Sequence, residues 1–177
     1  MLTLQGDRLY LRALEPEDLD FLHILENSEE FWEVSATQTP YSRYILKKYL
    51  ENSHLDIYEV RQLRLVICNS ENKPIGLIDI SDFDPKDRRA ALGILIANPE
   101  ERKKGYGAES LSLLCRYCFK HLGLHQVYAN IAADNYQSIK LFESQGFSKI
   151  GLKKEWFFYN GEFKDEYLYQ LINKDVF

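Results

Sequence analysis

The sequence feature that most constrains the fold is a glycine-containing turn between an apolar segment and an amphipathic helix. Residues 90–96 form an apolar run typical of a buried strand, and residues 102–108 follow with glycines at positions 105 and 107. The first amides of a helix lack intrahelical acceptors and the helix dipole adds positive charge there, so such a turn can bind a phosphate group. Glycine also lets the backbone approach a ligand without a Cβ atom in the way.

Two nucleotide-binding loops do not fit this turn. A P-loop needs four residues between its glycines and a Lys-Ser/Thr pair after the second glycine. A Rossmann loop needs Gly-x-Gly-x-x-Gly after the first strand of a βαβ unit, whereas Gly105-Tyr106-Gly107 is followed by Ala108-Glu109-Ser110. Two alternatives remain, a phosphate-binding turn of another kind and a glycine turn that only connects a strand to a helix.

Length, charge and composition narrow the class of protein. The 177 residues are enough for one domain with a real core, expected to span residues 1–177. A net charge of −5 argues against nucleic-acid binding through phosphate contacts. No apolar run is long enough to span a membrane and the N-terminus lacks a signal-peptide pattern, so neither a membrane association nor export is expected. The 12 Tyr and 10 Phe residues predict a broad aromatic core or an aromatic-lined cleft.

The three cysteines are an odd number, and two of them have the spacing of a metal-ligand pair. Cys115 and Cys118 nevertheless lie on the apolar face of a predicted helix, without a second Cys or His pair nearby in the sequence. We therefore expect core thiols in a reducing cytoplasm, and no metal site.

The spacing of apolar residues predicts strands and helices in the order β-α-α-β-β-β-α-β-α-β-β, which indicates an α/β or α+β fold with a mixed central sheet. A first helix is expected to open at residues 15–18, with a proline and carboxylates in its first turn. The Asn160-Gly161 pair is a strong hairpin signal. The strands are expected at 2–14, 64–68, 75–83, 88–96, 127–132, 147–158 and 162–172, and further helices at 41–52, from the glycine turn to about 122, and at 136–144.

A second motif makes the glycine turn more specific. Residues 135–147, Asn-Tyr-Gln-Ser-Ile-Lys-Leu-Phe-Glu-Ser-Gln-Gly-Phe, resemble the Asn-x-x-(Ala/Ser)-x-x-Leu-Tyr-x-x-x-Gly-Phe segment of the GNAT superfamily of N-acetyltransferases. Residues 102–108 resemble the coenzyme A pyrophosphate loop of the same superfamily. The resemblance spans nearly the whole chain. It implies a single GNAT-like domain with a mixed, mostly antiparallel central sheet flanked by helices.

Within this superfamily the chain resembles the group that contains the spermidine N-acetyltransferases and the ribosomal-protein N-terminal acetyltransferases. The similarity lies in residues 9–19, in Arg88-Arg89-Ala90 and in residues 157–163, which resemble the Phe-Phe-x-Asn-Gly hairpin of the spermidine enzymes. The resemblance implies transfer of an acetyl group from acetyl-CoA to a primary amine. The acceptor is then a small amine such as spermidine or, alternatively, the N-terminus of a protein.

The resemblance also assigns residues to the cofactor. The pyrophosphate is expected at the backbone amides and basic side chains of the loop Arg102, Lys103, Lys104, Gly105, Tyr106, Gly107 and Ala108. The pantetheine arm is expected to run along Ile94, Leu95 and Ile96, where a backbone amide polarises the thioester carbonyl. Asn135 and Ser138 are expected to contact the arm, although Asn135 is equally suited to cap a helix and 94–96 to fill a strand core.

Candidate proton acceptors are acidic residues, because an alkylammonium with a pKa of about 10 must lose a proton before it attacks a thioester. We consider Asp79, Asp82 and Glu33, the last if the segment after the first helix folds over the cleft; each is also a plausible surface charge. The proton donor of the superfamily is often the tyrosine of its Leu-Tyr pair, but position 142 is phenylalanine. Water or Tyr136 is the remaining candidate donor.

Three hypotheses of function follow. The acidic residues Glu26, Glu29, Glu30, Glu33, Asp79 and Asp82 favour a polyamine acceptor. The first alternative is acetylation of a protein N-terminus, and the second is a coenzyme A-binding regulatory domain with weak turnover, to which Phe142 lends support. Members of the group that the chain resembles form dimers or larger rings, so this chain could also form a homo-oligomer. The aromatic segment 155–169 would then supply either an interface or a wall of the cleft.

Overall fold

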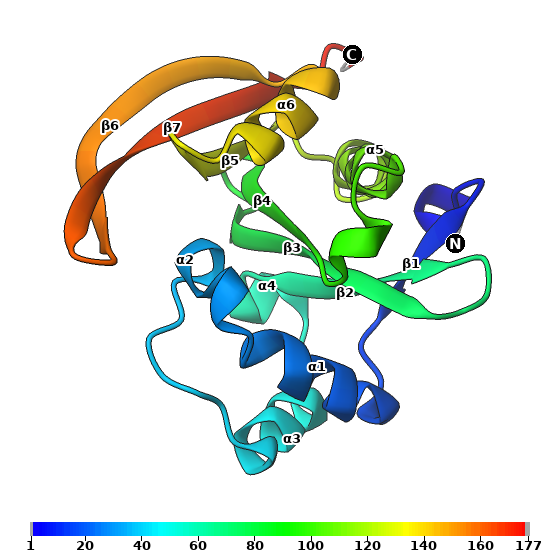
Figure 1. Cartoon of the computed structure of the whole chain (residues 1–177). Coiled ribbons are helices and arrows are strands. Elements are labelled where there is room, and N and C mark those ends of the chain that lie inside the picture. Colours follow the sequence, from blue (N-terminus) through cyan, green and yellow to red (C-terminus); the bar gives the residue numbers. More distant parts are fainter. Residues whose placement is uncertain (1, 176–177) are drawn as a thin grey trace.

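The computed structural model describes residues 2–175, which form one seven-stranded sheet with helices on both faces (Figure 1). The strand order is β1-β2-β3-β4-β5-β7-β6, and β4 and β5 are the parallel neighbours in an otherwise antiparallel sheet. The predicted mixed, mostly antiparallel sheet is therefore confirmed. The strands are β1 Leu9–Ala13, β2 Leu63–Asn69, β3 Pro74–Asp84, β4 Arg89–Ile96, β5 Gln126–Ala132, β6 Ser148–Tyr159 and β7 Glu162–Ile172.

The longer helices cover opposite faces of the sheet. In Figure 1, α1 and α3 lie on one side of β2 and β3, and α5 lies on the other side with α6 close by. No helix within residues 2–175 is long and apolar enough to cross a membrane. The helices are α1 Leu19–Glu26, α2 Trp32–Ser35, α3 Arg43–Glu51, α4 Ile57–Val60, α5 Tyr106–Lys120 and α6 Tyr136–Ser144.

Strand β2 shows how one sheet supports two cores. Leu65 and Ile67 pack in the cluster that contains the apolar face of α5. Val66 and Cys68, which alternate with them, pack in a second cluster with leucines of α1 and α3. Successive side chains of a strand point to opposite faces, so a strand covered on both faces needs an uninterrupted apolar run. This accounts for the unbroken apolar run in this segment.

The three cysteines belong to these cores. Cys68, Cys115 and Cys118 are buried free thiols, as predicted. Burial raises the pKa of Cys115 to about 12, so its thiol stays protonated and behaves as a small apolar group.

The N-terminal strand is shorter than predicted. A strand is expected over 2–14, but Leu2–Leu4 form a 3-10 turn and β1 begins at Leu9. The chain reverses between them because the Gly6 N–H donates to the Leu9 carbonyl at 2.9 Å. The backbone amides of Asp7 and Arg8 donate to the carboxylate of Glu109, at 2.8 and 2.9 Å. These bonds hold the turn against α5.

The region between the first and second strands contains two short helices that the sequence pattern does not predict. Helices α2 and α4 are each four residues long, which is too short to show a helical period. Each ends at a residue with left-handed backbone, Ala36 (φ 56°) and Arg61 (φ 61°). The α3 helix is predicted correctly, and it buries Leu46 and Leu50.

The C-terminal hairpin follows its sequence signal closely. Asn160 has φ 52° and Gly161 has φ 86°, and a two-residue turn of this type requires positive φ at both positions. Strands β6 and β7 extend beyond the rest of the sheet and curve away from it (Figure 1). The hairpin therefore forms a side wall next to β5.

Candidate active site

A cleft opens where β4 and β5 separate. The two strands pair only from Arg89 with Gln126 to Ala91 with Tyr128. Strand β4 continues to Ile96 while paired with β3 on its other side, so its edge toward β5 has no strand partner after residue 91 among the described residues. An unpaired strand edge next to a cavity is suited to bind an extended ligand through backbone hydrogen bonds.

Two adjoining pockets flank this free edge. The first has a volume of about 540 Å³ and lies under α1 and α3; we call it the helix-side pocket. The second has a volume of about 710 Å³ and reaches the hairpin; we call it the hairpin-side pocket. Both are lined by residues 92–94 of β4 and by Val34 and Thr37 from the α2 segment. The two pockets therefore share one wall and form a continuous cleft, with the α2 segment folded over it.

The predicted phosphate-binding loop has the expected helix start. Gly105, with φ 83°, caps α5, and the N–H of Glu109 donates the first bond of the helix to the Gly105 carbonyl at 3.1 Å. The amides of Tyr106, Gly107 and Ala108 precede that bond, so they are the N-terminal donors that a helix leaves for a ligand. The loop therefore fits a pyrophosphate.

The glycines of this loop also have structural reasons. A Cβ at Gly105 would lie 2.9 Å from the Arg8 guanidinium, and one at Gly107 would lie 3.3 Å from the Leu141 side chain. Gly107 thus permits close packing of α5 on α6, whether or not a ligand is bound. Of the two glycines, only Gly105 has a backbone conformation that favours glycine.

The basic residues around the loop differ in whether their charges are paired with other groups of the protein. Arg102 donates to the carbonyl of Ile96, at 3.2 and 3.3 Å, and to Glu30 at 2.7 Å, so its charge is already paired. Lys103 and Lys104 are exposed. Arg8, from the distant N-terminal segment, donates to the Lys104 carbonyl at 2.6 Å, a contact that sequence proximity does not reveal, but its charge is also paired, with Glu109 at 2.9 Å.

The second motif starts α6 beside the hairpin-side pocket. The Asn135 side chain accepts from the Ser138 N–H at 3.2 Å, which is an N-cap, and both residues line the pocket. Phe142 also lines the pocket but is only 3% exposed, and its ring packs edge-on against Phe147 at 5.0 Å. Tyr136 is 70% exposed and is not among the residues that line either pocket, so its position gives no support to a role as proton donor.

The strand segment assigned to the cofactor arm lies partly in the cleft. Ile94 lines both pockets and Leu95 lines the helix-side pocket. Ile96 lines neither: its side chain packs against the core, and its carbonyl accepts from Arg102. Leu92 and Gly93, which the sequence reasoning did not select, line both pockets.

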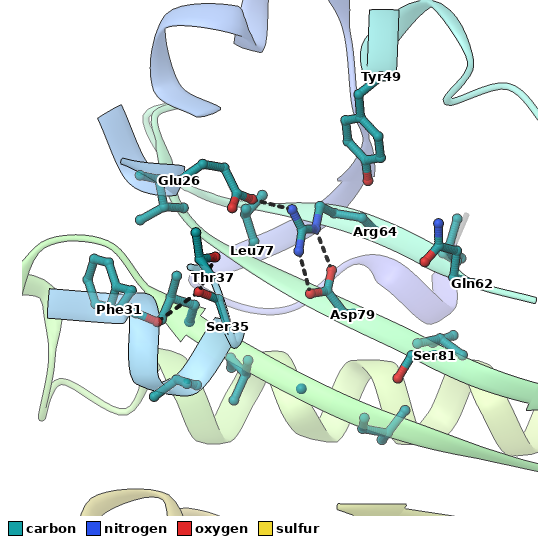
Figure 2. Close-up of a pocket in the computed structure, with 18 of the residues that line it drawn as sticks. Glu26, Phe31, Ser35, Thr37, Tyr49, Gln62, Arg64, Leu77, Asp79 and Ser81 are labelled. Carbon is teal, nitrogen blue, oxygen red and sulfur yellow. Dashed lines mark hydrogen bonds and ion pairs between the residues drawn. The ribbon is translucent and has the colours of Figure 1, made fainter. Parts of the chain in front are cut away.

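One predicted acid lies on the floor of the helix-side pocket. Figure 2 shows the Arg64 guanidinium between the carboxylates of Asp79 and Glu26. It donates to both oxygens of Asp79, at 2.8 and 2.9 Å, and to Glu26 at 2.5 Å. Burial lowers the pKa of Arg64, but the hydrogen bonds and charge of Asp79 more than offset this, so the pKa is raised and the guanidinium stays charged. Burial also raises the pKa of the neighbouring phenol of Tyr49.

A second predicted acid lies in the hairpin-side pocket. Glu33 of α2 accepts a hydrogen bond from the Lys164 ammonium at 2.6 Å, and Asp134 accepts one from the same ammonium at 2.9 Å. Hydrogen bonds to Glu33 and Asp134 raise the pKa of Lys164, so this side chain is charged at neutral pH. The condition set for Glu33, that the segment after α1 folds over the cleft, is met.

The third predicted acid lies outside the cleft. Asp82 is exposed, lines neither pocket and has φ 47°, at a point where the register between β3 and β4 shifts. Asp79 and Asp82 are separated by an odd number of positions, so in a regular strand they face opposite sides. Ser81, two positions from Asp79, lines the same pocket.

Comparison with known proteins identifies the family to which this fold belongs. Residues 8–148 match the acetyltransferase (GNAT) domain family. The chain belongs to the GNAT acetyltransferase family. As a GNAT acetyltransferase it uses acetyl-CoA as co-substrate, which confirms the predicted fold, enzyme class and co-substrate.

The relatives of this GNAT acetyltransferase include spermidine N-acetyltransferases. The chain is 32% identical over 163 residues to spermidine N(1)-acetyltransferase of Vibrio cholerae, covering 90% of each protein. A structure of spermidine N-acetyltransferase from Vibrio cholerae in complex with CoA and spermine matches with a TM-score of 0.85 at 28% identity, covering 94% of this chain and 96% of the other. A dodecameric structure of the same enzyme matches with a TM-score of 0.78 at 31% identity, covering 94% and 95%.

Proposed function

We propose that this GNAT enzyme acetylates a primary amine of a polyamine such as spermidine. The observation that carries the proposal is the placement of two pairs of carboxylates in the two pockets that flank the free β4 edge. Glu26 and Asp79 lie in the helix-side pocket, and Glu33 and Asp134 line the hairpin-side pocket. Carboxylates spaced along a partly apolar cleft suit a flexible chain that carries several ammonium groups. The names of the relatives support the same acceptor class.

The cofactor fits the remaining parts of the cleft. We propose that the N-terminal amides of α5 hold the pyrophosphate of acetyl-CoA and that the free edge of β4 at Ile94 and Leu95 holds its arm, with Asn135 and Ser138 on the other side. A backbone amide of that edge would stabilise the oxyanion that forms as the amine attacks the thioester carbonyl. The amine nitrogen gains the acetyl carbon, and the carbon–sulfur bond breaks.

Asp79 is our proposed proton acceptor, acting through water. The bidentate contact with Arg64 fixes this carboxylate and leaves each oxygen a further lone pair for a water or an ammonium. The attacking ammonium has a pKa of about 10 and must lose its proton first. The leaving thiolate has a conjugate acid with a pKa of about 8.5, so it can leave without a protein donor, as the phenylalanine at position 142 requires.

The test of the acceptor is a thiol-release assay with acetyl-CoA and a panel of amines. We expect turnover with spermidine and spermine, weaker turnover with butane-1,4-diamine, and little with peptides that have a free N-terminus. Selective turnover of the peptides would instead establish the N-terminal acetyltransferase alternative. If none of the amines in the panel supports thiol release, the result would favour the regulatory alternative and overturn the proposal.

The cofactor site has a separate test. The double substitution Lys103→Ala and Lys104→Ala removes two exposed charges next to the α5 start and leaves Gly105, with its positive φ, unchanged. We expect the KM for acetyl-CoA to rise on the order of tenfold, with a smaller effect at high salt, because exposed charges are screened. An unchanged KM at low salt would contradict the placement of the pyrophosphate.

We also propose that the enzyme is a cytoplasmic homo-oligomer. The dodecameric relative supports an assembly, and the hairpin exposes large apolar side chains that an interface would cover: Ile150, Leu152, Trp156, Phe158 and Phe163. The three free thiols suit a reducing compartment. Light scattering of the purified protein tests the assembly, and Trp156→Asp is expected to shift it toward smaller species.

A further inference from the structure

A lysine of the protein itself lies between two carboxylates at the hairpin-side pocket. The Lys164 ammonium is 2.6 Å from Glu33 and 2.9 Å from Asp134, and it lies 5.5 Å from the centre of the Tyr159 ring. Its side chain is only 16% exposed. Glu33, Asp134 and Tyr159 all line the pocket. The ammonium therefore lies at the wall of the proposed acceptor cleft.

The three groups around this ammonium are those that recognise an alkylammonium. Two carboxylates supply charge-assisted hydrogen bonds, and an aromatic face supplies a cation–π contact. A lysine side chain is four methylenes that end in an ammonium, which is also the structure of one end of butane-1,4-diamine. The geometry that holds Lys164 is consequently geometry that can hold the end of a diamine or polyamine.

The charges of the cluster allow the ammonium of a ligand to replace that of Lys164. Glu33 and Asp134 carry two negative charges and Lys164 carries one positive charge, so the cluster keeps a net negative charge that attracts cations. An ammonium is a point charge on a flexible stem and binds each carboxylate through a single contact. A second ammonium that replaces it makes the same kinds of contact, and the flexible stem of Lys164 lets its own ammonium move aside.

We propose that Glu33, Asp134 and Tyr159 form a subsite for the ammonium at the unreacted end of the acceptor, and that Lys164 fills it as a tethered competitor. The acceptor must displace Lys164 to bind, so the lysine raises the acceptor concentration that the enzyme needs. This inference rests on the polyamine acceptor proposed above and extends it to the end that is not acetylated.

The first test measures binding without acetyl-CoA. Lys164→Ala removes the competitor and leaves a space of the same shape, so n-butylammonium chloride should raise the melting temperature of this variant in a saturable way. We expect half-saturation at a concentration at least several-fold lower than for the wild type, and no such effect with n-butanol. Lys164→Met keeps the length of the side chain without its charge. Its melting temperature without additive shows whether the protein folds when the charge of Lys164 is absent.

Two further variants make the result specific. Lys154→Ala removes an exposed lysine of the same hairpin and should respond like the wild type. Adding Glu33→Gln to Lys164→Ala should remove the response to n-butylammonium. If Lys164→Ala and the wild type respond alike, or if Lys164→Ala responds without needing Glu33, the subsite does not exist and Lys164 only links α2 to the hairpin.

The second test is kinetic. If Lys164 fills the subsite about nine-tenths of the time, its removal should lower the KM for spermidine about tenfold. A purely structural lysine predicts the opposite, a higher KM, because α2 would be released from the hairpin. If no polyamine is turned over by any variant, the proposed function fails, whereas the binding of n-butylammonium still decides the existence of the subsite.

Discussion

Arg64 and Lys164 each hold two carboxylates of the cleft, and the two clusters differ in the cation and in their exposure. Arg64 binds both oxygens of Asp79 in a fork and reaches Glu26, and the side chains in this cluster are 26%, 33% and 14% exposed. Lys164 makes one contact to Glu33 and one to Asp134, and these three side chains are 16%, 26% and 56% exposed, so the greater exposure of this cluster lies in Asp134. A guanidinium fork fixes geometry, whereas an ammonium is readily exchanged.

The elements that each cluster joins show the same contrast. Glu26 lies on α1, Arg64 on β2 and Asp79 on β3, so the first cluster fastens a helix to the sheet (Figure 2). Lys164 joins three elements that line the hairpin-side pocket: the hairpin, α2 and the turn before α6. We infer that the Arg64 cluster is the fixed one, which holds the fold and keeps Asp79 in place, and that the Lys164 cluster is the one whose cation exchanges with a ligand. The predictions below test this division.

The largest expected effect is on stability. Arg64→Met leaves two partly buried carboxylates without their cation, and we expect the free energy of unfolding to fall by about 2–3 kcal/mol, since breaking a buried pair costs about 3–5 kcal/mol and this one keeps some exposure. Urea unfolding followed by circular dichroism measures it. Arg43→Met breaks an exposed pair with Asp20 and serves as the control, with a much smaller expected loss, because water and salt screen exposed charges. Equal losses in the two variants would remove the distinction.

The next effect separates chemistry from structure within the Arg64 cluster. Asp79→Asn keeps the shape of the side chain and one acceptor for Arg64 but cannot take up a proton. We expect kcat to fall on the order of a hundredfold, as for loss of a general base, with a smaller loss of stability than in Arg64→Met. Steady-state kinetics with spermidine measures it. A kcat within threefold of the wild type would exclude Asp79 as the proton acceptor.

Most of the local structure could be predicted from the sequence, because its signals lie within a few residues of one another. The strand, glycine turn and helix around residues 90–120, and the Asn160-Gly161 hairpin, are of this kind. The two motifs together also indicated the family. Helices α2 and α4 escape prediction because a single turn has no period, and only contacts with the sheet define them.

The cleft was harder to predict than the fold, because its charges meet over long sequence distances. Glu33 and Lys164 are 131 positions apart, and no local pattern connects them. Arg64 is 15 positions from Asp79 across a strand pairing whose register a sequence does not state. One error was avoidable: the odd spacing of Asp79 and Asp82 already places them on opposite faces of a regular strand.

The carboxylate–guanidinium pair of Asp18 and Arg12 extends the comparison to pH. Asp18 is 3% exposed and accepts two bonds from Arg12, each at 2.8 Å, and one from the Glu15 N–H. Burial raises the pKa of Asp18, but the Arg12 and Glu15 hydrogen bonds outweigh it and the pKa is lowered. A lowered folded-state pKa gives stability that is present above the unfolded value of about 3.9 and lost as the pH falls through the folded value.

Asp18→Asn therefore has two expected consequences. The free energy of unfolding at pH 7 should fall by about 1–2 kcal/mol, because the charge-assisted bonds to Arg12 become ordinary ones. The loss of stability between pH 5 and pH 3, measured by urea unfolding at a series of pH values, should also become smaller than in the wild type. A variant with the same acid dependence as the wild type would show that Asp18 does not contribute to it.

The smallest effects come from exchanging the two cations, and these variants test the division most directly. Arg64→Lys keeps the charge but loses the fork, so we expect a loss of about 1 kcal/mol in the free energy of unfolding and little change in the KM for spermidine. Lys164→Arg replaces the exchangeable ammonium by a fork that can hold Glu33 and Asp134 more firmly. For this variant we expect a KM for spermidine several-fold higher and an unchanged or slightly higher stability. If instead Arg64→Lys raises KM and Lys164→Arg lowers stability, the roles of the two clusters are the reverse of those assigned, since the cation that controls ligand entry would then be Arg64.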